Sequence, residues 1–279
     1  MHNIIKSSGK QEPFNVEKFE RSLKRVGAPA ALIKEITQEV LDRPKLDTTY
    51  KIYQYAYQKL KEWTRPLAAR YSLKNALYEL GPEGFIFERF AAELFKAQGY
   101  SVEVGKIVTG RCVDHEIDVI LKKNKDLSMA ECKFHNRRGL KTDVKVALYV
   151  KARYLDLSQE YPHGNTLLRT FKDVWLVTNT QFTSQAIQYS LCSGIRLLGW
   201  AFPEEKNIAY FIDTFGLHPV TSLTLLSRSQ KKFLLAKDVL LCRDLLEQPV
   251  VLQEFGFSQL QQQSVLDEAS HLCAQSNPL

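Results

Sequence analysis

The chain has 279 residues, of which 44% are hydrophobic and 25% are charged, and its formal net charge at pH 7 is +7. This composition suits a soluble protein with a packed core and excludes a globally disordered chain. The sequence shows neither a signal-peptide pattern nor an apolar run of the roughly 18 residues that a membrane span needs, so we expect a cytoplasmic protein. The positive charge favours a polyanionic partner, and the length predicts two or three domains.

The five cysteines are scattered along the chain, and no two of them have the CxxC spacing typical of zinc sites or redox dithiols. We therefore expect free thiols in a reducing compartment.

Residues 1–80 are predicted to form a small, mostly helical domain. Asn15 follows a proline and a phenylalanine and is a suitable N-cap for the first helix. Apolar residues at helical spacing mark the helices that follow. The predicted elements are a strand at 3–6 and helices at 16–26, 30–41 and 48–63.

Residues 81–219 mix strand and helix patterns, which predicts an α/β domain with a mixed sheet flanked by helices. The predicted elements are helices at 85–98, 144–156 and 183–193, and strands at 117–121, 128–134, 173–178 and 195–200. Residues 220–279 are predicted to form a small all-α domain, with helices at 227–237, 240–246, 250–255 and 259–273.

Two carboxylates and a lysine are the residues of the middle segment with the clearest chemical meaning. Asp118 lies on the first strand of a predicted hairpin, and Glu131 and Lys133 lie on the second strand. Glu131 and Lys133 are two residues apart and project from the same face, while Cys132 points the other way, into the core. Hydrolysis of a phosphodiester needs a hard cation such as Mg²⁺ or Mn²⁺, which carboxylates bind, and a lysine can orient the attacking water. The main-chain carbonyl of Cys132 is a further candidate ligand. The alternative is that Glu131 and Lys133 are a surface pair on an ordinary strand and that Asp118 caps a turn.

The same residues resemble the Mrr-type restriction endonucleases of the PD-(D/E)xK superfamily. In that family the aspartate and the glutamate bind the metal and the lysine assists the nucleophilic water. These roles fall on Asp118, Glu131 and Lys133, and the helix glutamate that often joins the metal site falls on Glu88. The resemblance covers roughly residues 81–205 and is carried by the stretches 84–90, 97–100, 117–119, 131–133, 177–183 and 194–200.

Five further polar residues lie close to these motifs. His115, Glu116 and His135 could touch phosphate or metal, although a structural histidine is the commoner role. Asn179 and Gln181, at the end of a strand, could meet substrate.

The first segment resembles an ATP-cone, a nucleotide-sensing module. The resemblance implies an ATP or dATP effector, with Lys6, Lys10 and Lys18 as candidate contacts to phosphate. Family members usually have Lys-Arg-Asp-Gly in the first turn, and this chain has Lys-Ser-Ser-Gly at 6–9. The alternative is a basic helical module that packs on the nuclease or touches DNA backbone. The matching stretches are 5–10, 13–15, 18–19, 22–23, 48–52 and 69–74.

The third segment is similar to helix-hairpin-helix domains, which hold nucleic-acid backbone through main-chain amides. A helical interaction or dimerisation unit is the alternative.

These interpretations together predict an α/β nuclease core between a helical ATP-cone and a small helical C-terminal domain. The expected reaction is endonucleolytic cleavage of DNA with Mg²⁺ or Mn²⁺, tuned by the nucleotide effector, and a homodimer is expected because duplex cleavage needs two active sites. Two alternatives remain: a catalytically silent nucleic-acid-binding or sensor protein, and a structure-specific or RNA nuclease that uses the same site.

Overall fold

The computed structural model describes residues 3–6, 9–81, 84–158 and 171–274 of the chain. They form two compact units: unit 1 combines Met1–Leu77 with His218–Ala274, and unit 2 comprises Tyr78–Leu217. Within the described ranges, every helix is too short or too polar to cross a lipid bilayer.

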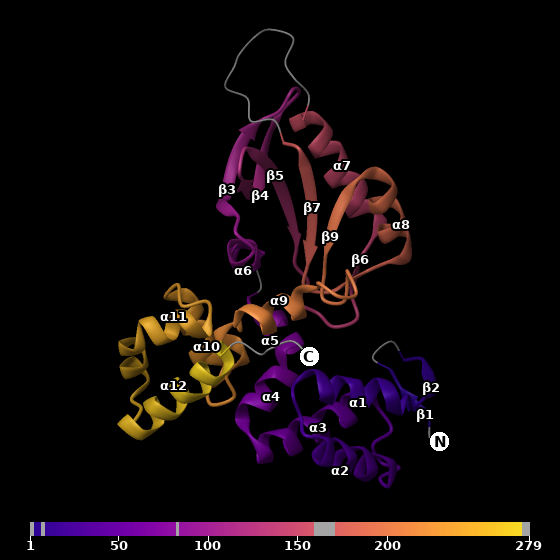
Figure 1. Ribbon diagram of the computed structural model, residues 1–279, viewed down its shortest axis with the longest axis vertical. Helices are drawn as coiled ribbons and strands as arrows, with labels where there is room; N and C mark the ends of the chain where they lie inside the picture. Colours follow the sequence, from indigo (N-terminus) through magenta and orange to yellow (C-terminus); the bar gives the residue numbers. More distant parts are fainter. Residues whose placement is uncertain (1–2, 7–8, 82–83, 159–170, 275–279) are drawn as a thin grey trace. The chain divides into compact units, whose positions relative to one another are not determined.

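Unit 2 is built on a five-stranded mixed sheet with the strand order β3-β4-β5-β7-β9 (Figure 1). Strands β3, β4 and β5 are antiparallel neighbours, whereas β5, β7 and β9 run parallel to one another. A separate parallel pair joins β6 to β8. The strands are β3 (Ser101–Thr109), β4 (Asp114–Lys123), β5 (Asp126–Lys133), β6 (Lys141–Thr142), β7 (Asp173–Thr178), β8 (Gln181–Phe182) and β9 (Ile195–Leu198), and the helices are α6 (Phe85–Ala97), α7 (Val144–Ser158), α8 (Ser184–Ser193) and α9 (Ile208–Phe215).

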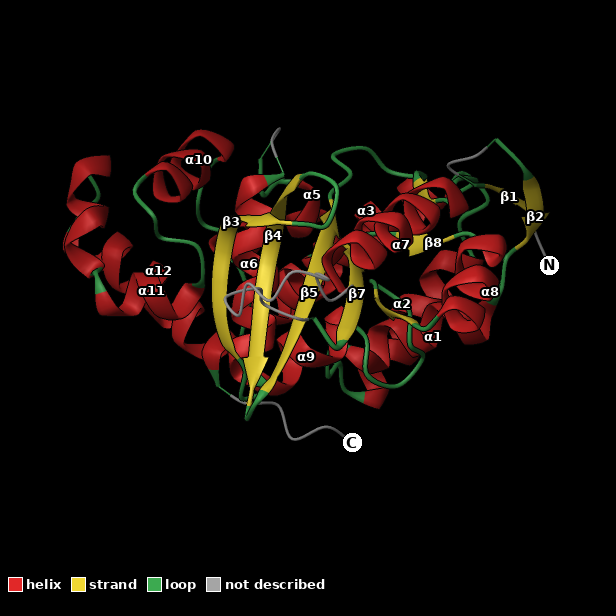
Figure 2. Ribbon diagram, turned by 90° about the horizontal axis from the view of Figure 1, so that it is seen from above, coloured by secondary structure: helices red, strands yellow, loops and turns green. Residues whose placement is uncertain are grey.

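Helices cover both faces of this sheet (Figure 2). On β7, Val174 and Leu176 belong to an apolar cluster with residues of α7 and α8. Trp175 lies between them in sequence, and its ring meets that of Phe95 on α6, with the ring centroids 5.3 Å apart. Because successive strand residues face opposite sides, α6 lies on one face and α7 and α8 lie on the other. The predicted mixed α/β fold is confirmed for this unit.

The N-terminal part of unit 1 is a bundle of helices that follows the antiparallel pair β1–β2. Asn15 caps α1 as predicted, because its side chain accepts a hydrogen bond of 2.7 Å from the Lys18 amide. Thr48 caps α3 in the same way. The buried faces of α1, α2 and α3 meet in one apolar cluster. The elements are β1 (Asn3–Ile5), β2 (Gln11–Pro13), α1 (Val16–Arg25), α2 (Ala30–Leu41), α3 (Thr49–Trp63), α4 (Arg65–Tyr71) and α5 (Leu73–Tyr78).

The C-terminal part of unit 1 is also helical and packs against the N-terminal part. Arg70 on α4 donates to the main-chain oxygen of His271 on α12 at 3.2 Å, and the Thr221 hydroxyl donates to the main-chain oxygen of Ala76 at 2.8 Å. The structure therefore has two compact units where the sequence predicts three segments in a row. The ATP-cone and helix-hairpin-helix assignments stay predictions. The elements are η1 (Val220–Ser222), α10 (Arg228–Ala236), α11 (Cys242–Glu247), η2 (Pro249–Phe255) and α12 (Gln259–Cys273).

Two predicted elements differ from the structure in their local form. The helix expected at 250–255 is a 3-10 helix, bounded by Pro249 and by Gly256 in the left-handed conformation at φ 66°. The connection between the strands predicted at 117–121 and 128–134 is shorter than expected, because the β4–β5 pairing extends to Lys123 and Asp126 and Asn124 adopts φ 56°.

Candidate active site

Asp118 lies where β4 turns away from β5. Opposite it lies Gly105 of β3, which has φ 61°; the pairing of β3 with β4 is interrupted at these two residues and continues in the same register on both sides. Within the described residues, β5 pairs with β4 only from Val119 onward. The first half of β4 therefore leaves β5 while it stays paired with β3. We call the point at Asp118 where β4 and β5 separate the fork.

The carboxylate of Asp118 closes the fork. Its Oδ2 accepts a hydrogen bond of 2.7 Å from the main-chain amide of Cys132 on β5. This amide lies just beyond the last β4–β5 pair, so the side chain satisfies a donor that the ladder leaves open. The hydrogen bond holds Asp118 beside the segment of β5 that carries Glu131 and Lys133.

Three carboxylates share the charge environment of the fork. Burial and, to a smaller extent, the negative charges of Asp118 and Glu116 together raise the pKa of Glu88 on α6 to about 7. Burial, followed by the charges of Asp118 and Glu88, likewise brings the pKa of Glu131 to about 7, although Arg153 and Lys133 oppose the shift. Burial also raises the pKa of Asp118, against the hydrogen bond from the Cys132 amide. The structure thus brings the predicted residues Glu88, Asp118 and Glu131 together.

The raised pKa of Glu88 leads to an expected pH dependence of stability. The carboxyl has a pKa of about 7 in the folded chain and an ordinary value of 4.5, so between these values the folded state holds a proton that the unfolded state has released. In metal-free buffer the free energy of unfolding should therefore fall as the pH rises through this window. Glu88→Gln should flatten the slope in urea titrations with EDTA, whereas Glu103→Gln on β3 should not. An unchanged slope in Glu88→Gln contradicts the electrostatic description.

Lys133 and Cys132 lie side by side on β5 and face different surroundings. Lys133 is exposed at the end of the strand, and its main-chain oxygen accepts a hydrogen bond of 2.7 Å from the Thr178 hydroxyl. The Cys132 thiol is buried, and burial raises its pKa well above the ordinary value. A contribution of Cys132 to a metal site would therefore come from its main-chain carbonyl, as the sequence predicts, and not from sulfur.

Asn179 and His135, two of the candidates outside the fork, form hydrogen bonds within the fold. Asn179 is fully buried, its Oδ1 accepts from the His135 amide at 2.9 Å, and its Nδ2 donates to the His135 carbonyl at 2.8 Å. The His135 ring lies 3.1 Å from the Thr142 hydroxyl. These contacts fix the chain after β5, so the expected substrate contact of Asn179 is wrong. Gln181 is exposed on β8 and stays a candidate.

His115 and Glu116 lie on the part of β4 beyond the fork. The His115 Nε2 is 2.8 Å from the carboxylate of Asp156 on α7, so His115 has the contacts of a structural histidine. Glu116 is exposed, and its negative charge acts on Glu88 and Asp118.

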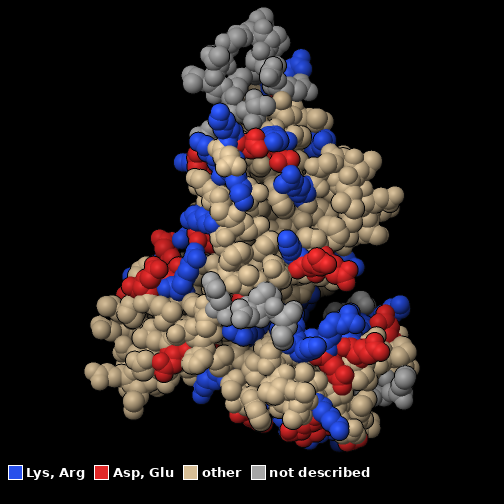
Figure 3. Space-filling view, in the orientation of Figure 1, with Lys and Arg blue, Asp and Glu red and all other residues tan. Residues whose placement is uncertain are grey.

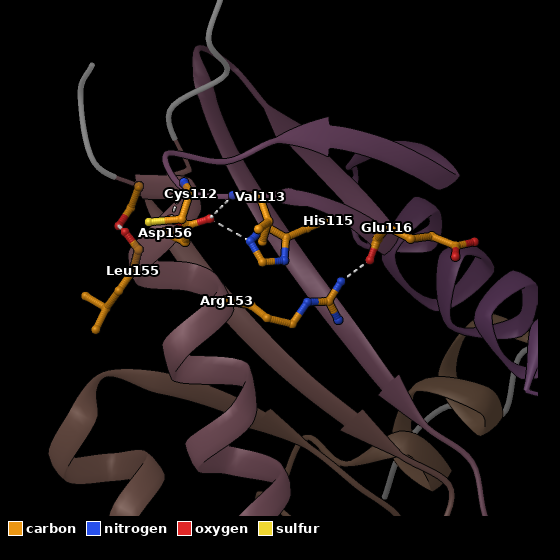
Figure 4. Close-up of polar contacts among 8 residues, drawn as sticks. Cys112, Val113, His115, Glu116, Arg153, Leu155 and Asp156 are labelled. Atoms are coloured by element: carbon orange, nitrogen blue, oxygen red, sulfur yellow. Dashed lines mark hydrogen bonds and ion pairs between the residues drawn. The ribbon is translucent and has the colours of Figure 1, made fainter. Parts of the chain in front are cut away.

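Arg153 on α7 is a residue of the site that the sequence analysis missed. The residue is only 8% exposed, and its Nη1 forms an ion pair with the Glu131 carboxylate. Its Nη2 donates to the main-chain oxygen of Glu116, as Figure 4 shows. The sequence contains a signal for this residue. Arg153 lies on the same face of the predicted helix as the buried Val150 and Leu157, and a charged residue on a buried face requires a partner.

The donor atoms at the fork fit a hard divalent cation. Oxygen ligands from carboxylates are those that Mg²⁺ and Mn²⁺ prefer, and a cation would stabilise the charged forms of Glu88 and Glu131, whose pKa values are raised by burial and by the neighbouring carboxylates. In the part of the chain that the structure describes, no three His, Cys, Asp or Glu side chains already stand in a metal-binding arrangement. Binding would therefore require side-chain adjustment of Glu88, Asp118 and Glu131.

The candidate nucleotide contacts of unit 1 fall into two groups. Lys6 and Lys10 each form an ion pair with Glu12, at 3.5 and 3.3 Å. Lys18 lies on α1, in the first turn after Asn15. The serines of the predicted first turn, at positions 7 and 8, lie outside the described residues.

Comparisons with known proteins assign two regions of the chain. A family described as "Restriction endonuclease" matches residues 81–199, and a family described as "AF1548-like, C-terminal" matches residues 218–273. An uncharacterized protein of Archaeoglobus fulgidus is 35% identical over 179 residues, which are 64% of this chain and 97% of that protein. A crystal structure of AF1548, a protein of unknown function, has 32% sequence identity and a TM-score of 0.54, and the match covers 70% of this chain and 100% of that one.

Proposed function

This chain belongs to the AF1548-like family and carries a restriction-endonuclease domain at residues 81–199, and we propose that it is a metal-dependent nuclease that cleaves DNA. The observation that carries the proposal is the fork. Asp118 is hydrogen-bonded across it to the segment of β5 that ends in Glu131, Cys132 and Lys133. All of these residues lie inside the matched domain.

The proposed roles follow from the exposure and charge of each residue. Asp118 and Glu131 supply carboxylate oxygens, with Glu88 and the Cys132 carbonyl as further ligands. When bound, Mg²⁺ or Mn²⁺ would neutralise phosphate charge and lower the pKa of the attacking water. Lys133 is exposed at the end of β5, where its ammonium group can hold the water or meet the negative charge that develops on the phosphate.

A substrate panel tests the proposal. Full-length protein is incubated with supercoiled plasmid, linear duplex, branched DNA, single-stranded DNA and RNA, each with Mg²⁺, Mn²⁺ or EDTA. We expect cleavage of DNA with either metal and none with EDTA. Cleavage confined to RNA or to branched DNA would favour the structure-specific or RNA nuclease, and DNA binding without cleavage under all conditions would favour a silent binding protein.

We also propose that unit 1 contributes a nucleotide effector site and contacts to DNA backbone. Support comes from the resemblance to an ATP-cone and from the lysines beside Glu12. On the face drawn in Figure 3, lysine and arginine side chains lie among acidic ones.

Calorimetric titration with ATP and dATP tests the effector site. Lys6→Ala combined with Lys18→Ala should weaken binding by up to about thirtyfold, since each lost contact between exposed charges contributes up to about 1 kcal/mol. Lys45→Ala, at an exposed position between α2 and α3, is the control. Wild-type protein that binds neither nucleotide would leave the alternative of a basic helical module. Sedimentation with and without duplex DNA tests the proposed homodimer.

A further inference from the structure

Helix α7 presents two charged side chains, one turn apart, to the same half of β4. Arg153 and Asp156 both lie on the side of the helix that faces the sheet, and their contacts are drawn in Figure 4. Both side chains contact the half of the β3–β4 hairpin that is no longer paired with β5. Neither of them contacts Asp118, the residue of β4 to which the family resemblance gives a role.

The first contact spans the fork. The Arg153 guanidinium donates from Nη2 to the main-chain oxygen of Glu116 on β4 and from Nη1 to the Glu131 carboxylate on β5. Two residues beyond Glu116 lies Asp118, where the strands rejoin. The planar guanidinium holds its donors in a fixed geometry, so it sets the position of one strand's backbone relative to the other strand's carboxylate. The guanidinium carbon of Arg153 also lies 5.3 Å from the centroid of the Tyr149 ring, one turn earlier on α7.

The second contact fixes the tip of the β3–β4 hairpin. The Asp156 carboxylate accepts from the amides of Cys112 at 2.9 Å and Val113 at 3.4 Å, and the His115 ring lies 2.8 Å from it. Gly110 makes this approach possible, because a Cβ there would lie 2.2 Å from the Asp156 Oδ2. The hydrogen bond from His115 and those from the amides lower the pKa of Asp156 to about 2, so the carboxylate is charged at neutral pH.

We propose that Arg153 and Asp156 are positioning residues of the site: together they dock the free half of β4 on α7 and so fix the distance between Asp118 and Glu131. This inference rests on the proposed function, because it concerns the spacing of the two carboxylates that would bind the metal. Partners of metal ligands that fix the orientation of those ligands commonly change metal affinity about 10–100-fold when they are removed.

Calorimetric titration of EDTA-treated full-length protein with Mn²⁺ tests the proposal without relying on activity. Arg153→Met should raise the Kd for Mn²⁺ about 10–100-fold. Arg153→Lys should also weaken binding, because one ammonium group cannot reproduce the two donors in their fixed positions. Asp156→Asn should fall between the wild type and Arg153→Met. The Mn²⁺ concentration for half-maximal DNA cleavage should rise in the same order.

Arg196→Met is the control, because Arg196 also pairs with a carboxylate, that of Asp173, and lies over an aromatic ring, that of Trp175. It should bind Mn²⁺ like the wild type. Thermal melting followed by circular dichroism identifies folded variants, and if both Arg153 variants fail to fold, Asp156→Asn decides alone.

Unchanged or tighter Mn²⁺ binding in a folded Arg153→Met, or wild-type affinity in Arg153→Lys, overturns the positioning role. So does wild-type affinity in Asp156→Asn when it is the deciding variant. A wild-type protein that binds no Mn²⁺ and cleaves no DNA contradicts the proposed function itself, and the two failures are therefore distinguishable.

Discussion

Asp118→Asn is expected to lower DNA cleavage by at least about 100-fold, because a direct metal ligand should matter more than the residues that orient ligands. The substitution removes one negative charge from the site. The asparagine Oδ1 can still accept the hydrogen bond that Asp118 takes from the Cys132 amide, so the fork should stay closed. Initial rates of plasmid nicking at a fixed Mg²⁺ concentration measure the effect.

Asp114→Asn is the matched control, because Asp114 is an exposed aspartate on the same strand. It should cut at the wild-type rate. Calorimetry with Mn²⁺ should show weaker binding by Asp118→Asn alone. Equal cleavage by the two variants contradicts the assignment of Asp118 as a metal ligand.

Phe95→Ala is expected to destabilise unit 2 by about 3–5 kcal/mol, the usual cost of removing a buried aromatic side chain. Phe95 is fully buried on α6, and its ring packs against Trp175 at 5.3 Å and Tyr100 at 5.7 Å. The substitution would remove the contact between α6, which carries Glu88, and Trp175 of the sheet, and would leave a cavity there. Urea unfolding followed by circular dichroism measures the change in the transition of this unit.

Phe85→Ala serves as the control on the same helix. Phe85 is 54% exposed, so its removal should change the free energy of unfolding by no more than about 0.5 kcal/mol. If Phe85→Ala destabilises the unit as much as Phe95→Ala, the packing of α6 on the sheet is wrongly described.

Elements with strong local signals could be predicted from the sequence. β7 occupies the predicted range 173–178, since its apolar residues are flanked by turn-forming ones, and α2 occupies the predicted 30–41. Glu131 and Lys133 follow from strand periodicity, because Cys132 between them is buried as the alternation requires.

Features created by tertiary contacts could not be predicted in this way. β3 was missed because most of its residues are exposed and it carries little apolar periodicity; it forms because β4 offers a partner along its length. The interruption of the β3–β4 pairing at Gly105 and the ion pair of Arg153 with Glu131 depend on contacts between different strands and helices. Sequence spacing places the carboxylates on neighbouring strands, but it does not show that α7 holds those strands apart.

The central claim is that Asp118, Glu131 and Lys133 form a hydrolytic centre, and Lys133 is the member of this centre whose removal tests the claim most directly. We would measure nicking of supercoiled plasmid by wild type and Lys133→Ala, with Mg²⁺, Mn²⁺ or EDTA and with and without ATP. Lys133 is exposed, so the variant should fold, and the loss of one preorganised cationic group should lower the rate about 10²–10³-fold. Equal rates for the two proteins, or a wild type that binds DNA and cuts under none of these conditions, would contradict a hydrolytic centre at Asp118, Glu131 and Lys133.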